Sequence, residues 1–239
     1  MAVYGIMETK SFRINKTNCI DYIAYSNDHA GILPGSDHIL DIYFSSLIPC
    51  PDDPGLFPPE RNDYLKSTKL DHARSQSYTA WKLLEIAIKH SFDMSMQELS
   101  PHKLASGKWV SSSLFFSISH TKTSAAVAVS DSDVGIDIED ADAFALKHNS
   151  IPKRFMSRIL SPNDEPVSCC DHVGFLKLWT AKESIYKLNN REQFIPSEID
   201  TSSFPTASIL IELDHRNVIS VAYNKPTPIR IFRIDFESV

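Results

Sequence analysis

The sequence lacks a long apolar run and an excess of positive charge. No apolar stretch approaches the roughly 20 residues that a membrane-spanning helix needs, so no membrane segment is expected. The formal net charge of −6 argues against nucleic-acid binding, because proteins of that kind usually need a basic face to displace counterions. Residues 1–8 have no cationic start and no apolar stretch of signal-peptide length, so no secretory signal is expected either.

Cysteine is also scarce, with four in the whole chain. Cys19 and Cys50 stand alone, while Cys169 and Cys170 are neighbours, which is a poor arrangement for a disulfide framework. No CxxC pair and no Cys/His spacing typical of a zinc site occurs. Reduced cysteines are usual in the cytoplasm, so this pattern favours a cytoplasmic protein.

What the sequence does contain is the composition of a globular protein, because 42% of its 239 residues are hydrophobic and 23% are charged. Apolar residues at a helical period, uninterrupted by proline or glycine, predict a long helix over about 70–90. A second strong helix is predicted over about 173–188 and a shorter one within 141–148, while the prolines between 49 and 62 predict a loop. Strands are predicted at 114–119, 125–130, 134–139, 207–213, 218–223 and 229–236.

Each half of the chain thus reads as a helix beside a small antiparallel sheet, although no repeat is visible at the level of single residues. This order predicts an α+β protein with internal pseudo-symmetry. We place the halves at residues 1–140 and 141–239, each with one of the two long helices. A functional site is expected at their junction.

The segment Gly135-Ile136-Asp137-Ile138-Glu139 carries two acidic residues on a predicted strand. Successive side chains of a strand point to opposite faces, so Asp137 and Glu139 share one face while the isoleucines fill the other. Neighbouring carboxylates repel unless a positive charge lies between them, and magnesium accepts such a pair together with substrate phosphates. The alternative is a half-buried strand whose polar face meets water.

A second segment, WTAKESIYK at 179–187, lies on the second long helix. Glu183 and Lys187 are four residues apart and therefore share a helical face, with Trp179 one turn earlier. Taken alone, the pair is equally typical of an ordinary surface ion pair beside a core tryptophan.

The strand FSISH at 116–120 ends in two polar residues that can offer donors to a phosphate. Ser119 and His120 are adjacent and point to opposite faces, so they are not expected to activate each other as a nucleophile pair. Lys108 and Arg74 are further cations that could hold an anion, Arg74 near the start of the first long helix. Solvated surface charges are the alternative for both.

In this order and spacing, the segments resemble the signature of the phosphopantetheinyl transferase superfamily. That signature reads approximately (F)xxSH, then GxDxE, then WxxKEAxxK. The chain supplies FSISH at 116–120, GIDIE at 135–139 and WTAKESIYK at 179–187. Its length resembles the surfactin-synthetase-activator (Sfp-type) branch, whose members carry two similar halves in one chain. The resemblance therefore implies the 4'-phosphopantetheinyl transferase fold, in which two similar α/β halves are related by a pseudo-twofold axis.

Three further segments show weaker similarity to the same family. DHARS at 71–75 is similar to the arginine-bearing stretch of the family, Gly107-Lys108 matches part of its GKP motif, and KRFMS at 153–157 resembles its (K/R)RFFS segment. Trp109 stands where the family usually has proline, which puts the path of the coenzyme-binding loop in doubt. Two small polar departures are Ser117, where asparagine is common, and Ser184, where alanine is common.

The resemblance implies transfer of the 4'-phosphopantetheine group of coenzyme A to a serine of an apo acyl or peptidyl carrier protein, with release of adenosine 3',5'-bisphosphate. Asp137, Glu139 and Glu183 would hold Mg²⁺. Glu183, directly or through a water molecule, would take the serine proton, and Lys187 would stabilise or protonate the departing phosphate. The residues implied in binding coenzyme A are Arg74, Lys108, Ser119, His120, Lys182 and Lys187.

A monomer whose partners are coenzyme A and a carrier protein, without nucleic acid or membrane, is expected. Two alternatives stay open, another magnesium-dependent phosphoryl-transfer or phosphohydrolase enzyme, and a degenerate module that only binds carrier proteins. Carrier proteins are usually acidic, so a basic or apolar patch beside the site is expected. Lys153, Arg154, Phe155 and Met156 are candidates for it, although charges at a helix end with buried apolar neighbours explain them as well.

Overall fold

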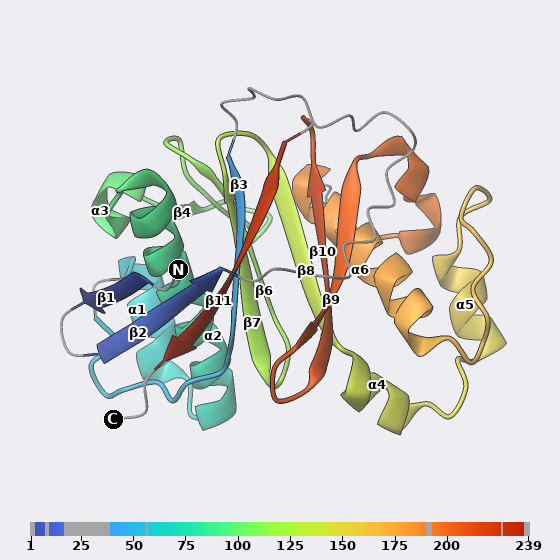
Figure 1. The fold of residues 1–239 in the computed structure, drawn as a ribbon, viewed down its shortest axis with the longest axis horizontal. Helices are drawn as coiled ribbons and strands as arrows, with labels where there is room; N and C mark the ends of the chain where they lie inside the picture. Colours follow the sequence, from blue (N-terminus) through green and yellow to red (C-terminus); the bar gives the residue numbers. More distant parts are fainter. Residues whose placement is uncertain are drawn as a thin grey trace.

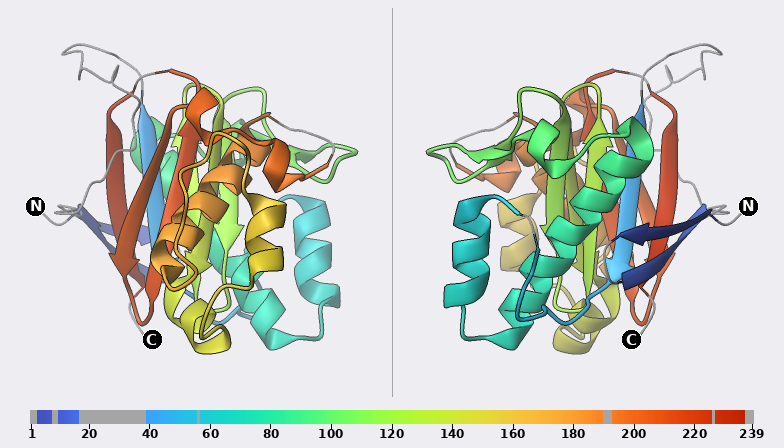
Figure 2. Two further views of the ribbon diagram at one scale, coloured as in Figure 1. Left: turned by 90° about the vertical axis from the view of Figure 1, so that its right-hand side faces the viewer. Right: turned by 90° about the vertical axis from the view of Figure 1, so that its left-hand side faces the viewer.

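The computed structural model describes residues 3–7, 10–16, 39–55, 57–189, 193–225 and 227–236. Two β-sheets pack face to face, and one long helix covers the outer face of each sheet (Figure 1). The helices are α2 (Asp71–Phe92) on the larger sheet and α6 (His172–Asn189) on the smaller one. Figure 2 views the molecule from these two sides, with α6 toward the viewer in one panel and α2 in the other. The mixture of helix and sheet confirms the predicted α+β class.

The larger sheet has the strand order β1-β2-β11-β3-β7-β6, and the smaller has the order β8-β10-β9. A two-stranded ribbon, β4-β5, precedes β6. The strands are β1 (Val3–Met7), β2 (Lys10–Lys16), β3 (Leu40–Ser46), β4 (His102–Lys103), β5 (Trp109–Val110), β6 (Phe115–His120), β7 (Ser124–Ser130), β8 (Val134–Asp140), β9 (Thr206–Glu212), β10 (Arg216–Tyr223) and β11 (Ile229–Phe236). The shorter helices are α1 (Pro59–Ser67), α3 (Met96–Leu99), α4 (Ala141–Lys147) and α5 (Lys153–Ile159), with 3-10 turns η1 (Pro196–Glu198) and η2 (Thr201–Ser203).

The core between the two sheets follows from strand alternation. On β8, Ile136 and Ile138 are buried against apolar residues of β3, β7, β9 and β10. Asp137 and Glu139 therefore face the other way, toward α6, with Gly135 on the same side. The predicted alternation of this strand is confirmed, and it directs both carboxylates to one face.

The two long helices form where the apolar period predicted them. Trp81, Leu84 and Ile88 of α2 are buried against the larger sheet. Phe175 of α6 packs on the smaller sheet together with Leu176. Burial of such apolar faces is the main source of helix stability in a folded protein.

The last strand does not continue the smaller sheet. β11 lies in the larger sheet, where Ile231 pairs with Ile42 of β3 in parallel and Ile234 pairs with Ile14 of β2 in antiparallel register. A strand that follows its neighbour after a short turn often pairs with it, but pairing with β3 buries both apolar faces of β11, one under α2 and one between the sheets. β8 in turn belongs to the smaller sheet, so the sheets do not follow the division at residue 140, which stays a prediction.

Three short helices, α1, α3 and α5, were not predicted. α1 begins at Pro59, inside the predicted loop over 49–62, because a proline at the first helical position loses no hydrogen bond. α5 covers the segment whose resemblance was noted at 153–157.

Cys19 lies outside the described residues, and the other cysteines form no disulfide. Within the described part of the chain, no helix combines the length and the apolar character that crossing a membrane requires.

Candidate active site

The candidate site lies where the edge strands of the two sheets meet. Ser117 of β6 accepts a hydrogen bond from the backbone N–H of Ile136 on β8, at 3.0 Å. Two residues further along β6 and one further along β8, the Ser119 hydroxyl lies 2.7 Å from Oδ1 of Asp137. The contact between the strand edges therefore sets the serine of FSISH beside the first carboxylate of GIDIE.

Gly135 explains how α6 approaches β8 so closely. A Cβ atom at this position would lie 2.0 Å from the carbonyl oxygen of Ser184 and 2.6 Å from the backbone nitrogen of Leu188. Only glycine leaves room for the helix backbone at that distance. The glycine of the motif thus allows Glu183, on this turn of α6, to reach the carboxylates of the strand.

Asp137, Glu139 and Glu183 form an acidic cluster whose ligand atoms all lie within 4.8 Å of one another. Asp137 is buried, with 3% of its surface exposed. Its Oδ1 accepts hydrogen bonds from Ser119 and Lys187, whereas its buried Oδ2 has no partner among the described residues. An orphaned carboxylate oxygen facing two further carboxylates fits a hard divalent cation such as Mg²⁺.

Burial and the neighbouring negative charge raise the pKa values of the two glutamates of the cluster. Burial, and then the charge of Asp137, raise the pKa of Glu139 to about 7, while a hydrogen bond from Trp179 lowers it in part. The same two causes, in the same order, raise the pKa of Glu183 to about 8. Perturbation of this size by burial and a specific neighbouring charge is typical of functional sites.

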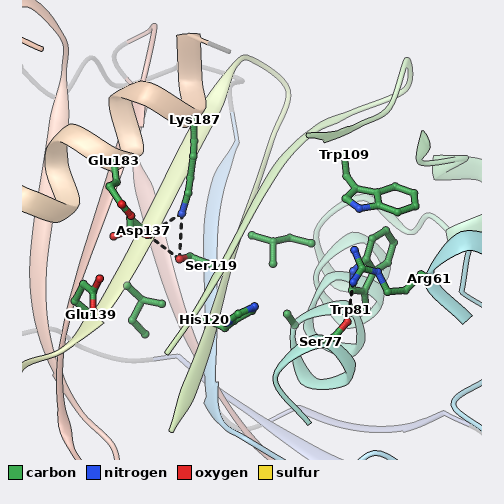
Figure 3. A pocket seen from close by; sticks show the side chains of 13 residues that line it. Arg61, Ser77, Trp81, Trp109, Ser119, His120, Asp137, Glu139, Glu183 and Lys187 are labelled. Carbon is green, nitrogen blue, oxygen red and sulfur yellow. Dashed lines mark hydrogen bonds and ion pairs between the residues drawn. The ribbon is translucent and has the colours of Figure 1, made fainter. Parts of the chain in front are cut away.

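Lys187 is the cation of the cluster. Its amino group donates to Oδ1 of Asp137 at 2.7 Å, to the Ser119 hydroxyl at 3.1 Å and to the carbonyl of Ile136 at 3.0 Å. Lys108 donates in turn to the backbone carbonyl of Lys187, at 2.6 Å. The lysine therefore bridges α6, β8 and β6 at one point (Figure 3).

A cavity of about 370 Å³ opens beside the cluster, within the range of small-molecule sites. His120 lines it, and loss of solvation, followed by the field of Lys187 and other cations, lowers the pKa of its imidazole. A neighbouring cavity of about 280 Å³ is lined by Lys108 and shares Lys187 with the first. The first cavity is lined by Arg61, Ser77, Ala80, Trp81, Trp109, Ile118, Ser119, His120, Asp137, Ile138, Glu139, Glu183 and Lys187.

The structure brings together most of the residues expected at the site, but not all. Lys182 is fully buried on another side of α6, where it pairs with Asp164 at 2.5 Å and donates to the carbonyls of Pro196 and Ile199. Lys182 therefore lines neither cavity, and its contact with coenzyme A stays a prediction. Adjacent helix positions are turned by about 100°, so Lys182 cannot share the face of Glu183.

Arg74 also lies outside the lining of both cavities. Its guanidinium donates to the carbonyl of Pro51 at 3.4 Å and lies 3.8 Å from Asp71. Arg61 instead provides the arginine of the first cavity. No sequence signal pointed to Arg61, because it falls in a segment whose prolines predicted a loop.

Comparison with known proteins agrees with the geometry. Residues 133–233, from the turn before β8 into β11, match the family model of the 4'-phosphopantetheinyl transferase superfamily. No curated protein matches the chain significantly. The match contains Asp137, Glu139, Glu183 and Lys187, which the structure gathers at one point. The strand and the helix that supply the acidic cluster thus lie in a segment that is similar to the 4'-phosphopantetheinyl transferase superfamily.

Proposed function

We propose that the protein transfers the 4'-phosphopantetheine group of coenzyme A to a serine hydroxyl of an apo acyl or peptidyl carrier protein. The observation that carries this proposal is the meeting of three carboxylates and one lysine at the wall of a cavity. A superfamily match over the strand and helix that supply them adds support.

In this reaction the serine oxygen forms a bond to the β-phosphorus, and the bond from that phosphorus to the bridging oxygen breaks. Adenosine 3',5'-bisphosphate leaves with the bonding electrons. Bound Mg²⁺, held by Asp137, Glu139 and Glu183, would neutralise charge on the diphosphate. Catalysis of this transfer needs mainly positioning of the reactants and stabilisation of negative charge, because the phosphoryl group itself is the electrophile.

Glu183 is the proposed base for the serine proton, because its carboxylate lies at the cavity wall beside the cluster where the diphosphate would bind. Lys187 stabilises negative charge on the departing phosphate. Ser119 acts as a positioning residue, because its hydroxyl bonds Oδ1 of Asp137 and leaves Oδ2 for the ion. His120 and Lys108, at the walls of the two cavities, are proposed to contact the coenzyme.

The direct test is incubation with coenzyme A, Mg²⁺ and a panel of apo carrier proteins. The expected result is a mass gain of one phosphopantetheine on a carrier, with equimolar release of adenosine 3',5'-bisphosphate. Glu183→Gln is expected to slow transfer by about 100-fold or more, as loss of a general base does. Glu165→Gln, which removes an exposed carboxylate outside the cavity, is the matched control.

The outcomes separate the alternatives. Release of phosphate or nucleotide from coenzyme A with no gain on any carrier would identify a phosphohydrolase. Binding of a carrier without transfer would identify a non-catalytic module. Unchanged transfer by Glu183→Gln would remove Glu183 from the proposed chemistry.

We further propose the two-half, single-chain organisation of the Sfp-type branch, with halves at residues 1–140 and 141–239 and the site at their junction. A cytoplasmic monomer is proposed as well. Support for the organisation comes from the helix on each outer face and from the site where the two sheets meet.

A further inference from the structure

The turn that leads into α6 presents two thiol groups side by side. Cys169 and Cys170 are both exposed, and their Sγ atoms lie 3.8 Å apart. The backbone N–H of Asp171 donates to the carbonyl of Ser168 at 3.0 Å, so the two cysteines are the central residues of a β-turn. Neighbouring side chains of an extended segment point to opposite sides, whereas this turn brings the two sulfurs into contact.

Hydrogen bonds on both sides hold the turn in place. The carbonyl of Cys169 accepts from the backbone N–H of Ile151 at 2.8 Å. Asp171 follows the pair, and its Oδ1 accepts from the N–H of Gly174 in the first turn of α6, at 2.8 Å. The folded backbone therefore keeps the thiols close together. An S–S bond is about 2.05 Å long, so its formation requires the sulfurs to approach by less than about 2 Å.

Packing does not account for this pair of cysteines. Structural cysteines are usually buried, but neither Cys169 nor Cys170 belongs to the hydrophobic clusters that the described residues form. Neither residue lines the two cavities of the candidate active site. Exposed thiols exchange with disulfides, and a second thiol beside the first can displace the group that becomes attached. The arrangement therefore fits a redox reaction of the pair better than a contribution to the core.

We propose that Cys169 and Cys170 form a redox-active dithiol that low-molecular-weight disulfides, such as glutathione disulfide, convert to an intrachain disulfide. One cysteine thiolate attacks a sulfur of glutathione disulfide, which breaks the S–S bond of that molecule and releases one glutathione thiolate. The neighbouring thiolate then attacks the protein sulfur of the mixed disulfide and releases the second glutathione. The chain loses two electrons and two protons, and glutathione disulfide gains them as two thiols.

The oxidation is expected to be reversible. Adjacent Cα atoms are about 3.8 Å apart, which is less than the usual separation of about 4.4–6.8 Å across a disulfide, so the bond is strained. Strained and exposed disulfides are reduced more easily than structural ones. The pair should therefore respond to the ratio of oxidised to reduced glutathione instead of staying permanently oxidised.

The test is incubation of the full chain with glutathione disulfide, then alkylation of the remaining thiols and mass spectrometry of the peptide that contains residues 169 and 170. The wild-type peptide is expected to lose two hydrogen atoms, to carry neither glutathione nor the alkyl label, and to regain both thiols in dithiothreitol. Cys169→Ser and Cys170→Ser are each expected to retain one glutathione on the remaining cysteine, because no neighbouring thiol can release it.

Cys50→Ser is the control, since it removes a half-buried cysteine of another segment and is expected to leave oxidation of the pair unchanged. Circular dichroism of each variant verifies that the fold is intact. Two glutathiones on the wild-type peptide, a disulfide to a second chain, or thiols that stay free would each overturn the inference. The reaction requires neither coenzyme A nor Mg²⁺, so these outcomes leave the proposed function standing.

Discussion

The amino group of Lys187 lies 2.7 Å from Oδ1 of Asp137 and joins the second long helix to the strand of the smaller sheet. The Ser119 hydroxyl shares the same carboxylate oxygen. Asp137 is thereby fixed in orientation, and its buried Oδ2 has no hydrogen-bond partner among the described residues. One helix residue thus neutralises part of the acidic cluster and also orients its most buried member.

Lys187→Ala is expected to lower the turnover number for phosphopantetheine transfer by about 100-fold, because a cation that stabilises the departing phosphate is lost. The variant is expected to fold, since 27% of the lysine side chain is exposed. Stabilisation by Mg²⁺, measured as the rise in melting temperature, is expected to be at least as large as in wild type because the cluster becomes more negative.

Lys177→Ala, one further lysine on the same helix and outside both cavities, is the matched control and is expected to transfer normally. If Lys187→Ala also lost its response to Mg²⁺, the lysine would be needed chiefly to orient Asp137. Full activity of Lys187→Ala would exclude the proposed role.

Gly135→Ala is expected to abolish transfer by separating the helix from the strand. The added methyl group would meet backbone atoms of Ser184 and Leu188, which cannot yield as a side chain can. Overpacking of this kind costs about 1–3 kcal/mol of unfolding free energy. Urea unfolding should show that loss, and the Mg²⁺-induced rise in melting temperature should shrink as Glu183 moves away from Asp137. A variant with wild-type stability and activity would mean that the helix does not need this close approach.

The sequence predicted the elements that hold the cluster because the signals there are local. Strand alternation put Asp137 and Glu139 on one face, and the four-residue helical spacing put Glu183 and Lys187 together. Local signals cannot tell which strand the last segment joins, since the parallel pairing of β11 with β3 links residues nearly at opposite ends of the described chain. Arg61 was missed for the same reason, because only tertiary packing places it against Trp81 and Trp109.

The buried ion pair of Lys182 with Asp164 leads to a prediction about stability. Its side chain and that of Asp164 are both fully buried, and Asp164 also accepts from the backbone of Ser161 and the hydroxyl of Thr201. Lys182→Met is expected to cost about 3–5 kcal/mol, because it leaves an uncompensated charge in the interior. Urea unfolding measures this loss.

The double variant Lys182→Met with Asp164→Leu should recover much of the stability, since both buried charges are then absent. Transfer should recover with it, because neither side chain lines the cavities. A stable, folded single variant Lys182→Met that transfers poorly would instead return this lysine to the coenzyme site.

The raised pKa values of Glu139, about 7, and Glu183, about 8, predict opposite effects of pH on the metal-free and the metal-loaded protein. The folded chain holds protons on these carboxyls that the unfolded chain releases near pH 4.5, so the free energy of unfolding should fall as pH rises from about 4.5 to about 8. Mg²⁺ requires the deprotonated carboxylates, so its affinity for the cluster should rise over the same pH range.

In the presence of a chelator, the melting temperature should be lower at about pH 8.5 than at about pH 6. The increase in melting temperature that Mg²⁺ causes should be larger at the higher pH. Glu183→Gln, which removes the group with the higher pKa, should weaken both dependences. An equal response to Mg²⁺ at both pH values would show that protons and metal do not compete for this cluster.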